Sequence, residues 1–88
     1  MNSKRKVFLE FKSRSYYYYK EKDGTKPYTV RKLDKEDNRN YILEHGEPTH
    51  VRIVRADNPV EFFEREITDT TWMDMFGLWG IAWKHEGD

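Results

Sequence analysis

Apolar and polar residues alternate over five stretches of the chain, and a period of two is typical of strands with one buried face. We expect strands over residues 5–12, 28–33, 49–55, 60–68 and 78–84. The last is the clearest, because Trp79, Ile81 and Trp83 fall on one face while Gly80 and Ala82 fall on the other. The large face is predicted to fill the core, and the small face lets another element approach closely.

Two of the intervening segments carry helix signals. Residues 13–23 favour a short helix, with Ser13 or Ser15 as its N-cap and Gly24 at its C-terminal end. Residues 34–44 favour a polar helical turn that begins at Asp34.

The two remaining connections differ in kind. Ala56-Asp57-Asn58-Pro59 is a cluster of turn residues between two predicted strands, which predicts a β-hairpin. Residues 69–77 are rich in aromatic residues and methionine, and we expect them to form a connection before the last strand.

These elements define the expected fold class. Five short strands, one or two short helices and the absence of β-α-β spacing predict a small, mostly antiparallel α+β domain that spans residues 1–88. With so few strands, we expect the sheet to curl into a partly closed barrel, which limits its exposed edges. A mean hydropathy of −1.05 would suit a disordered segment, but 16% aromatic residues supply the burial that disordered chains lack.

The charges are unevenly distributed along a chain whose formal net charge is zero. Residues 1–33 hold ten Lys or Arg and three Asp or Glu, and the rest hold six and thirteen, so the halves carry +7 and −7. Such asymmetry indicates a basic face for an anionic partner. The alternative is that folding interleaves the halves into ion pairs on a solvated surface.

The chain contains no cysteine, which excludes a disulfide framework and a thiolate metal site and favours a cytoplasmic protein. His45, His50 and His85 lack metal-ligand spacing, so we expect no metal and no cofactor. The apolar run Val7-Phe8-Leu9 is too short for a signal peptide, and no stretch is long enough to cross a membrane.

Lys26, Thr29, Arg31 and Glu66 form the first candidate site. Thr29 and Arg31 are two apart on a predicted strand and project to one face, and Lys26 precedes that strand. A lysine, a hydroxyl and a carboxylate in one cleft can activate a nucleophile: the base removes the hydroxyl proton and the lysine stabilises the developing charge. The alternative is a cross-strand ion pair of Arg31 with Glu66, with Thr29 as an ordinary strand residue.

At these residues the chain resembles the ASCH domains, which share the PUA-like β-barrel fold. Lys26, Thr29 and Arg31 match the pattern Lys-x-x-Thr-x-Arg of the small amidohydrolases of N4-acetylcytidine, and Glu66-Ile-Thr68 is similar to their later Glu-Val-Thr. The resemblance implies a PUA-like barrel that binds RNA or a nucleotide. It further implies catalytic roles for Thr29 as nucleophile, Lys26 as activating group and Glu66 as general base, with Arg31 in the ligand site.

The second candidate is the run of four tyrosines with a lysine after it, composed of Tyr16, Tyr17, Tyr18, Tyr19 and Lys20. Four consecutive rings cover every side of a helix, so the core cannot take all of them. Exposed tyrosines among lysines suit base stacking and phosphate contacts on single-stranded nucleic acid or a nucleotide. The alternative is that two rings lie in the core and two lie flat on the surface.

The third candidate is an aromatic and methionine cluster near the C-terminus, formed by Trp72, Met73, Met75, Phe76, Trp79 and Trp83. So apolar a cluster in so polar a chain is typical of a core. The alternative is an exposed patch over residues 72–76 that contacts another protein or a second copy of the chain.

Three function classes follow. The one that we favour is a binding module for a nucleotide, a nucleoside or single-stranded RNA. The second is the amidohydrolase that the resemblance implies. The third is a compact inhibitor, of the kind that phages and mobile elements carry, which binds a host protein through its acidic half and the aromatic patch.

Overall fold

The computed structural model describes residues 5–86, which form five strands and two short helices with one π-helical turn. The helical elements are α1 (Ser15–Lys22), α2 (Asn38–Tyr41) and the π-helical turn η1 (Ile42–Gly46). The strands are β1 (Phe8–Ser13), β2 (Tyr28–Arg31), β3 (His50–Arg55), β4 (Phe62–Met73) and β5 (Leu78–Trp83). The predicted α+β class, the five strands and the hairpin of β3 and β4 are confirmed.

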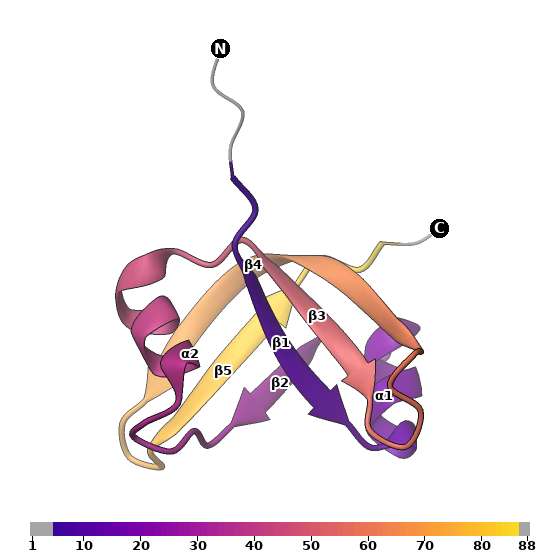
Figure 1. Ribbon diagram of the computed structural model, residues 1–88, viewed down its shortest axis with the longest axis horizontal. Coiled ribbons are helices and arrows are strands. Elements are labelled where there is room, and N and C mark those ends of the chain that lie inside the picture. Colours follow the sequence, from indigo (N-terminus) through magenta and orange to yellow (C-terminus); the bar gives the residue numbers. More distant parts are fainter. Residues whose placement is uncertain (1–4, 87–88) are drawn as a thin grey trace.

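All five strands belong to one sheet in the order β1-β3-β4-β5-β2. The pairs β3–β4, β4–β5 and β2–β5 are antiparallel, but β1 runs parallel to β3, so the sheet is mixed (Figure 1). The parallel pair arises because α1, β2, α2 and η1 lie between β1 and β3 in the chain, and this long crossover returns the strand in the same direction. The sheet is therefore less antiparallel than the sequence predicted.

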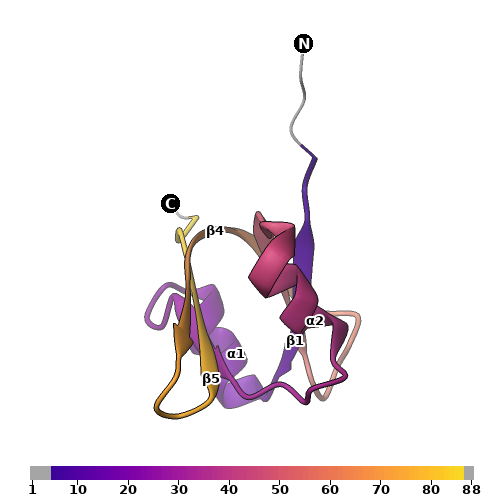
Figure 2. The same ribbon diagram turned by 90° about the vertical axis from the view of Figure 1, so that its left-hand side faces the viewer.

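The sheet curls into a half-barrel whose two edges, β1 and β2, are not paired with each other. Figure 2 shows it as an arch, with β1 and β5 on opposite sides and β4 passing over the top. The helices α1 and α2 lie at opposite ends of this arch. We call the gap between the edge strands β1 and β2 the seam.

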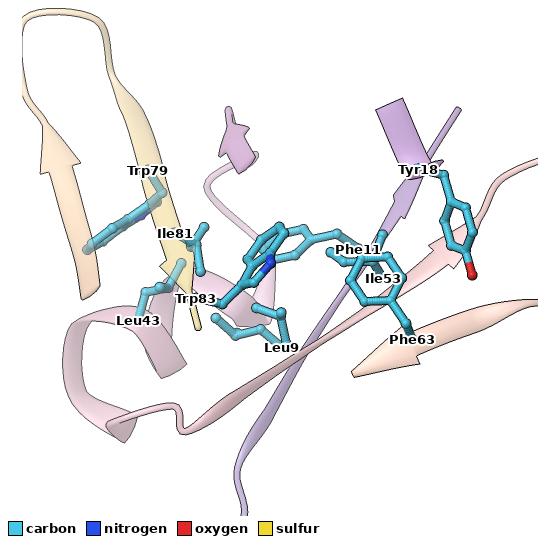
Figure 3. Packing of buried hydrophobic residues seen from close by; sticks show 10 residues of the cluster. Leu9, Phe11, Tyr18, Leu43, Ile53, Phe63, Trp79, Ile81 and Trp83 are labelled. Carbon is cyan, nitrogen blue, oxygen red and sulfur yellow. The ribbon is translucent and has the colours of Figure 1, made fainter. Parts of the chain in front are cut away.

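The core fills the inside of the arch (Figure 3). The alternating residues of β1, β3 and β5 supply most of it, as predicted, and Tyr18 of α1, Leu43 of η1 and Phe63 of β4 join them. The buried cluster consists of Leu9, Phe11, Tyr18, Leu43, Val51, Ile53, Phe63, Trp79, Ile81 and Trp83.

Residues 69–77 differ from the prediction, because β4 continues to Met73 and only a short turn precedes β5. A shift in register between Ile67 and Asp69 marks a β-bulge, which lets one long strand bend and pair with β3 and then with β5. Gly77 closes the turn at a φ of 63°, in the left-handed region that glycine tolerates. The sequence predicted that the strand ends before Asp69, but at that point the strand bends and continues.

The helix caps also differ from the prediction. Arg14 is the N-cap of α1, and neither Ser13 nor Ser15 caps it through a side chain. Asp37, and not Asp34, caps α2, where its carboxylate accepts a hydrogen bond from the Arg39 amide. Gly24 follows the C-cap of α1 with a φ of 89°, as expected for a residue that ends a helix.

Candidate functional site

A cavity of about 420 Å³ opens at the seam, where the end of β1, helix α1 and strand β2 meet. Its lining residues are Lys12, Ser13, Arg14, Tyr17, Glu21, Lys26, Thr29, Val30 and Arg31. Three residues of the first candidate site, Lys26, Thr29 and Arg31, therefore lie at one cavity. Thr29 and Arg31 reach it because alternate residues of β2 point inwards, so Thr29 is only 3% exposed.

Arg31 connects the two edge strands across the seam. Its Nε donates to Thr29 Oγ1 on its own strand at 2.8 Å. Its Nη1 donates to the main-chain oxygen of Lys12 at 2.9 Å, and its Nη2 donates to Ser13 Oγ at 2.8 Å, both at the end of β1. Its guanidinium also lies over the Phe11 ring, with 5.0 Å between Cζ and the ring centroid. One side chain thus holds β2 to β1 where no ladder does.

The carboxylate at this cavity belongs to Glu21, which the sequence analysis did not select. Its side chain is 1% exposed, and both oxygens accept hydrogen bonds: Oε1 from Ser13 Oγ at 2.8 Å, and Oε2 from Lys26 Nζ at 2.9 Å. A buried carboxylate requires such partners, because its desolvation is otherwise costly. Tyr18 is also buried and precedes Glu21 by three residues, so the two share the inner face of α1. That spacing was the signal available in the sequence.

Glu66 lies outside this cavity. It is an exposed residue of β4, on the face of the strand opposite the inward-facing Phe63 and Arg65. It pairs with His50 in the ladder with β3, and its main-chain oxygen accepts a hydrogen bond from the Lys84 amide. The alternation of β4 turns its carboxylate away from the interior. The expected meeting of Glu66 with Lys26 and Thr29, and its expected pairing with Arg31, are therefore not seen.

Lys26 is held by aromatic rings as well as by Glu21. Its Nζ lies 4.7 Å from the centroid of the Tyr28 ring and 5.8 Å from that of the Tyr17 ring. It also donates to the main-chain oxygen of Tyr28 at 2.8 Å. Cation–π contacts attract an ammonium to the face of a ring. These contacts and the two hydrogen bonds hold Nζ of Lys26 in place at the cavity wall.

The four tyrosines of α1 have separate environments. Only Tyr18 lies in the core, where it packs on Phe63 and where burial raises the pKa of its phenol. Tyr17 is 48% exposed and lines the cavity. Tyr16 accepts a hydrogen bond from Lys20 Nζ at 2.9 Å. This hydrogen bond lowers the pKa of Tyr16 and raises the pKa of Lys20.

Tyr19 points to the β3–β4 hairpin, where its hydroxyl accepts a hydrogen bond from Arg55 Nη1 at 2.8 Å. Since Tyr16, Tyr17 and Tyr19 are 64%, 48% and 45% exposed, one ring of the run is buried, not two. Of these tyrosines and Lys20, Tyr17 alone belongs to the cavity lining.

The cavity wall is strongly basic. Lys12, Arg14, Lys26 and Arg31 face a single acid, and that acid is already paired. Burial lowers the pKa of Arg31, and the nearby Arg39 acts in the same direction, but a guanidinium remains charged at neutral pH. All charged residues of the wall lie between positions 12 and 31, so the cavity belongs to the basic half of the chain.

The aromatic and methionine cluster divides into two parts. Trp79 and Trp83 are buried in the core, as predicted. The prediction of a core is wrong for Trp72, Met75 and Phe76, which are 47%, 87% and 67% exposed.

Trp72 pairs with Trp79 and lies on the same face of the sheet. At this end of β4 the strand pairs with β5, whereas its pairing with β3 ends at Glu66. Met75 and Phe76 lie in the turn. A homodimer contact here stays a prediction.

Among residues 5–86, no group of three or more His, Cys, Asp or Glu side chains is arranged to hold a metal ion. No helix within this range has the length and apolar character needed to cross a bilayer.

No family model and no curated protein sequence matches the chain.

Proposed function

We propose that this domain binds a nucleotide or a short single-stranded RNA, with a phosphate group in the seam cavity. The basic wall supports this function. The ammonium of Lys26 and the guanidinium of Arg31 are fixed by hydrogen bonds, and Lys12 and Arg14 add positive charge beside them. Charge-assisted hydrogen bonds from Lys and Arg are the strong contacts that phosphates form in proteins. Glu21 repels an anion little, because Lys26 and Ser13 occupy its oxygens.

Tyr17 supports a nucleotide over a free phosphate ion. Its ring is half-exposed and lines the same cavity as the basic side chains. Stacking of a base on an aromatic ring contributes about 1–3 kcal/mol. Phosphate contacts and a stacking ring at one cavity are the two components of nonspecific recognition of single strands.

The hydrogen bonds of Thr29 favour binding over amide hydrolysis. A nucleophilic hydroxyl needs a base that accepts its proton. Thr29 Oγ1 instead accepts a hydrogen bond from Arg31 Nε, and none of the hydrogen bonds within residues 5–86 runs from this hydroxyl to a carboxylate. Glu21, the carboxylate of the cavity, is occupied by Ser13 and Lys26.

The fold that we propose for this half-barrel is the PUA-like barrel of ASCH domains. The chain resembles these domains in the motif formed by Lys26, Thr29 and Arg31. The binding role and the resemblance agree, since ASCH domains resemble RNA-associated modules. The half-barrel and the positions of these three residues support the assignment.

Titration calorimetry with cytidine 5′-monophosphate and with an eight-nucleotide single-stranded RNA tests this function. We expect the affinity for both to fall steeply with salt, because phosphate contacts release counterions. Arg14→Ala should weaken binding about fivefold at low salt, since it removes an exposed charge from the cavity wall. Lys84→Ala is the matched control, because it removes the same charge from an exposed position outside the cavity.

Absence of binding, or equal losses in Arg14→Ala and Lys84→Ala, would contradict the proposal. The enzyme alternative is checked on the same protein by incubation with N4-acetylcytidine. Release of acetate that disappears in Thr29→Ala would replace binding with amide hydrolysis as the function.

A further inference from the structure

The edge of β2 at the seam carries main-chain groups that no neighbouring strand pairs. In the antiparallel ladder with β5, the Trp83 amide donates to the main-chain oxygen of Pro27 at 3.1 Å. Hydrogen-bonded and non-hydrogen-bonded pairs alternate, so Thr29 and Arg31 are bonded to β5. The N–H and C=O groups of Tyr28 and Val30 therefore point away from β5, towards the seam.

The side-chain hydrogen bonds to the two edges of the seam agree with this alternation. On β2, the main-chain oxygen of Tyr28 accepts from Lys26 Nζ. On the opposite edge, β1, the corresponding oxygens of Glu10 and Lys12 accept from Arg39 and Arg31. Long basic side chains thus occupy three carbonyl groups that point into the seam.

Val30 differs from these positions. It lines the cavity, yet the side-chain hydrogen bonds within residues 5–86 include none to its N–H or C=O. Alternation turns its side chain to the outer face of the sheet, where it is 46% exposed and also lines a second cavity. Its N–H and C=O, which the ladder with β5 leaves pointing to the seam, offer one donor and one acceptor side by side.

We propose that the main chain of Val30 reads the Watson–Crick edge of the nucleobase of the bound nucleotide. Each nucleobase carries a hydrogen-bond donor next to an acceptor on that edge, which complements the N–H and C=O of one extended residue. Lys26 and Arg31, the proposed phosphate ligands, line the same cavity as Val30. This inference rests on the proposed function, and it names the part of the ligand that the seam recognises beyond its phosphate.

Val30→Pro tests the contact, because proline removes the N–H of an edge strand where β5 does not use it. Proline also suits the extended backbone of β2, and Thr29 before it is already extended. Val30→Ala is the matched control, since it shortens the exposed side chain and keeps the N–H. We expect Val30→Pro to bind cytidine 5′-monophosphate about fivefold more weakly, the effect of one hydrogen bond, and Val30→Ala to bind as the native chain does.

Ribose 5-phosphate separates this inference from the proposed function, because it has the phosphate and no base. We expect Val30→Pro and the native chain to bind it equally. If the native chain binds neither compound, the proposed function fails. If the native chain binds both and Val30→Pro binds the nucleotide normally, or loses both compounds alike, the base contact alone is overturned.

A nuclear magnetic resonance titration covers the case in which Val30→Pro does not fold. In the native chain, the amide signal of Val30 should shift further with cytidine 5′-monophosphate than with ribose 5-phosphate, whose phosphate binds at the neighbouring Arg31 and leaves the Val30 N–H without a partner. Equal shifts with both compounds would contradict the base contact.

Discussion

The half-barrel holds its strands together in two different ways. From β1 through β3, β4 and β5 to β2, main-chain ladders join each strand to the next. Between β1 and β2, at the seam, the side chain of Arg31 makes the connection by donating to Lys12 and Ser13. Arg39 of α2 adds a hydrogen bond to the main-chain oxygen of Glu10 on the same edge of β1. Both guanidinium groups lie over the ring of Phe11, which belongs to the core.

The difference separates stability from binding. A closed ladder uses its main-chain groups and leaves none at that edge for a ligand. The gap that Arg31 spans leaves space, positive charge and the unpaired main-chain groups of Val30 in one place. Joining two strands through long side chains stabilises the fold less than a ladder does, because these side chains lose conformational entropy when they are fixed. We infer that the ladders provide most of the stability and that the seam provides the proposed binding site.

The largest effect on the free energy of unfolding is expected for a core residue on a strand that ladders join on both sides. Ile53 of β3 is fully buried, so Ile53→Ala should lower the free energy of unfolding by about 3 kcal/mol through lost burial and the cavity left behind. Urea unfolding measures the loss, and Val60→Ala, at an 83% exposed position, should stay within about 0.5 kcal/mol of the native chain. A loss below about 1 kcal/mol in Ile53→Ala would contradict the assignment of stability to this side.

A smaller effect is expected at the seam. Glu21→Gln keeps the size of the side chain but removes the charge that Lys26 and Ser13 contact, and hydrogen bonds to charged groups contribute about 1.5–3 kcal/mol. We expect a loss of about 2 kcal/mol in urea unfolding. Glu66→Gln is the control and should change the free energy of unfolding by less than about 0.5 kcal/mol, because its position on β4 is exposed. Equal losses in the two variants would mean that Glu21 is not the carboxylate that holds the seam.

The ladder side is also the part of the fold that the sequence predicted best. Val51 and Ile53 of β3 fall on one face of the strand, and so do Trp79 and Trp83 of β5. This period of two predicts which face is buried, and the structure buries that face. The pairing of β1 with β3 could not be predicted in this way, because alternation identifies a strand but not its neighbour. The sequence did not predict that β4 continues past Asp69, because a β-bulge interrupts the period of two at that residue.

The site was predictable only in part. Lys26, Thr29 and Arg31 are close in the chain, and one strand with its preceding loop brings them together. The position of the carboxylate depends on how α1 packs beside the end of β1 and beside Lys26, and no local pattern specifies that contact. The spacing of Tyr18 and Glu21 by three residues indicates a shared face of α1, but glutamate is rarely buried, so the pattern alone predicts burial of the tyrosine and not of the carboxylate.

The smallest of these effects concerns the second arginine at the seam. Asp37 holds Arg39 in place: its Oδ1 accepts from the Arg39 amide and from Nε, both at 2.9 Å, and its Oδ2 accepts from Nη2 at 2.6 Å. These hydrogen bonds lower the pKa of Asp37 to about 2. Asp37→Ala removes the N-cap of α2 and should cost about 1 kcal/mol in urea unfolding at pH 7.

The dependence on pH follows from the lowered pKa. The folded chain holds the Asp37 carboxylate ionised below the usual pKa of an unfolded aspartate, about 3.9, so its contribution is complete above that pH and disappears as the pH falls through about 2. The difference between Asp37→Ala and the native chain should therefore be constant from pH 7 to about 5 and shrink below pH 4. Asp34→Ala is the control, because Asp34 is the exposed residue that the sequence indicated as the cap, and its substitution should have little effect at any pH. A larger loss in Asp34→Ala than in Asp37→Ala would assign the cap to Asp34 and contradict the role of Asp37 as the partner that orients Arg39.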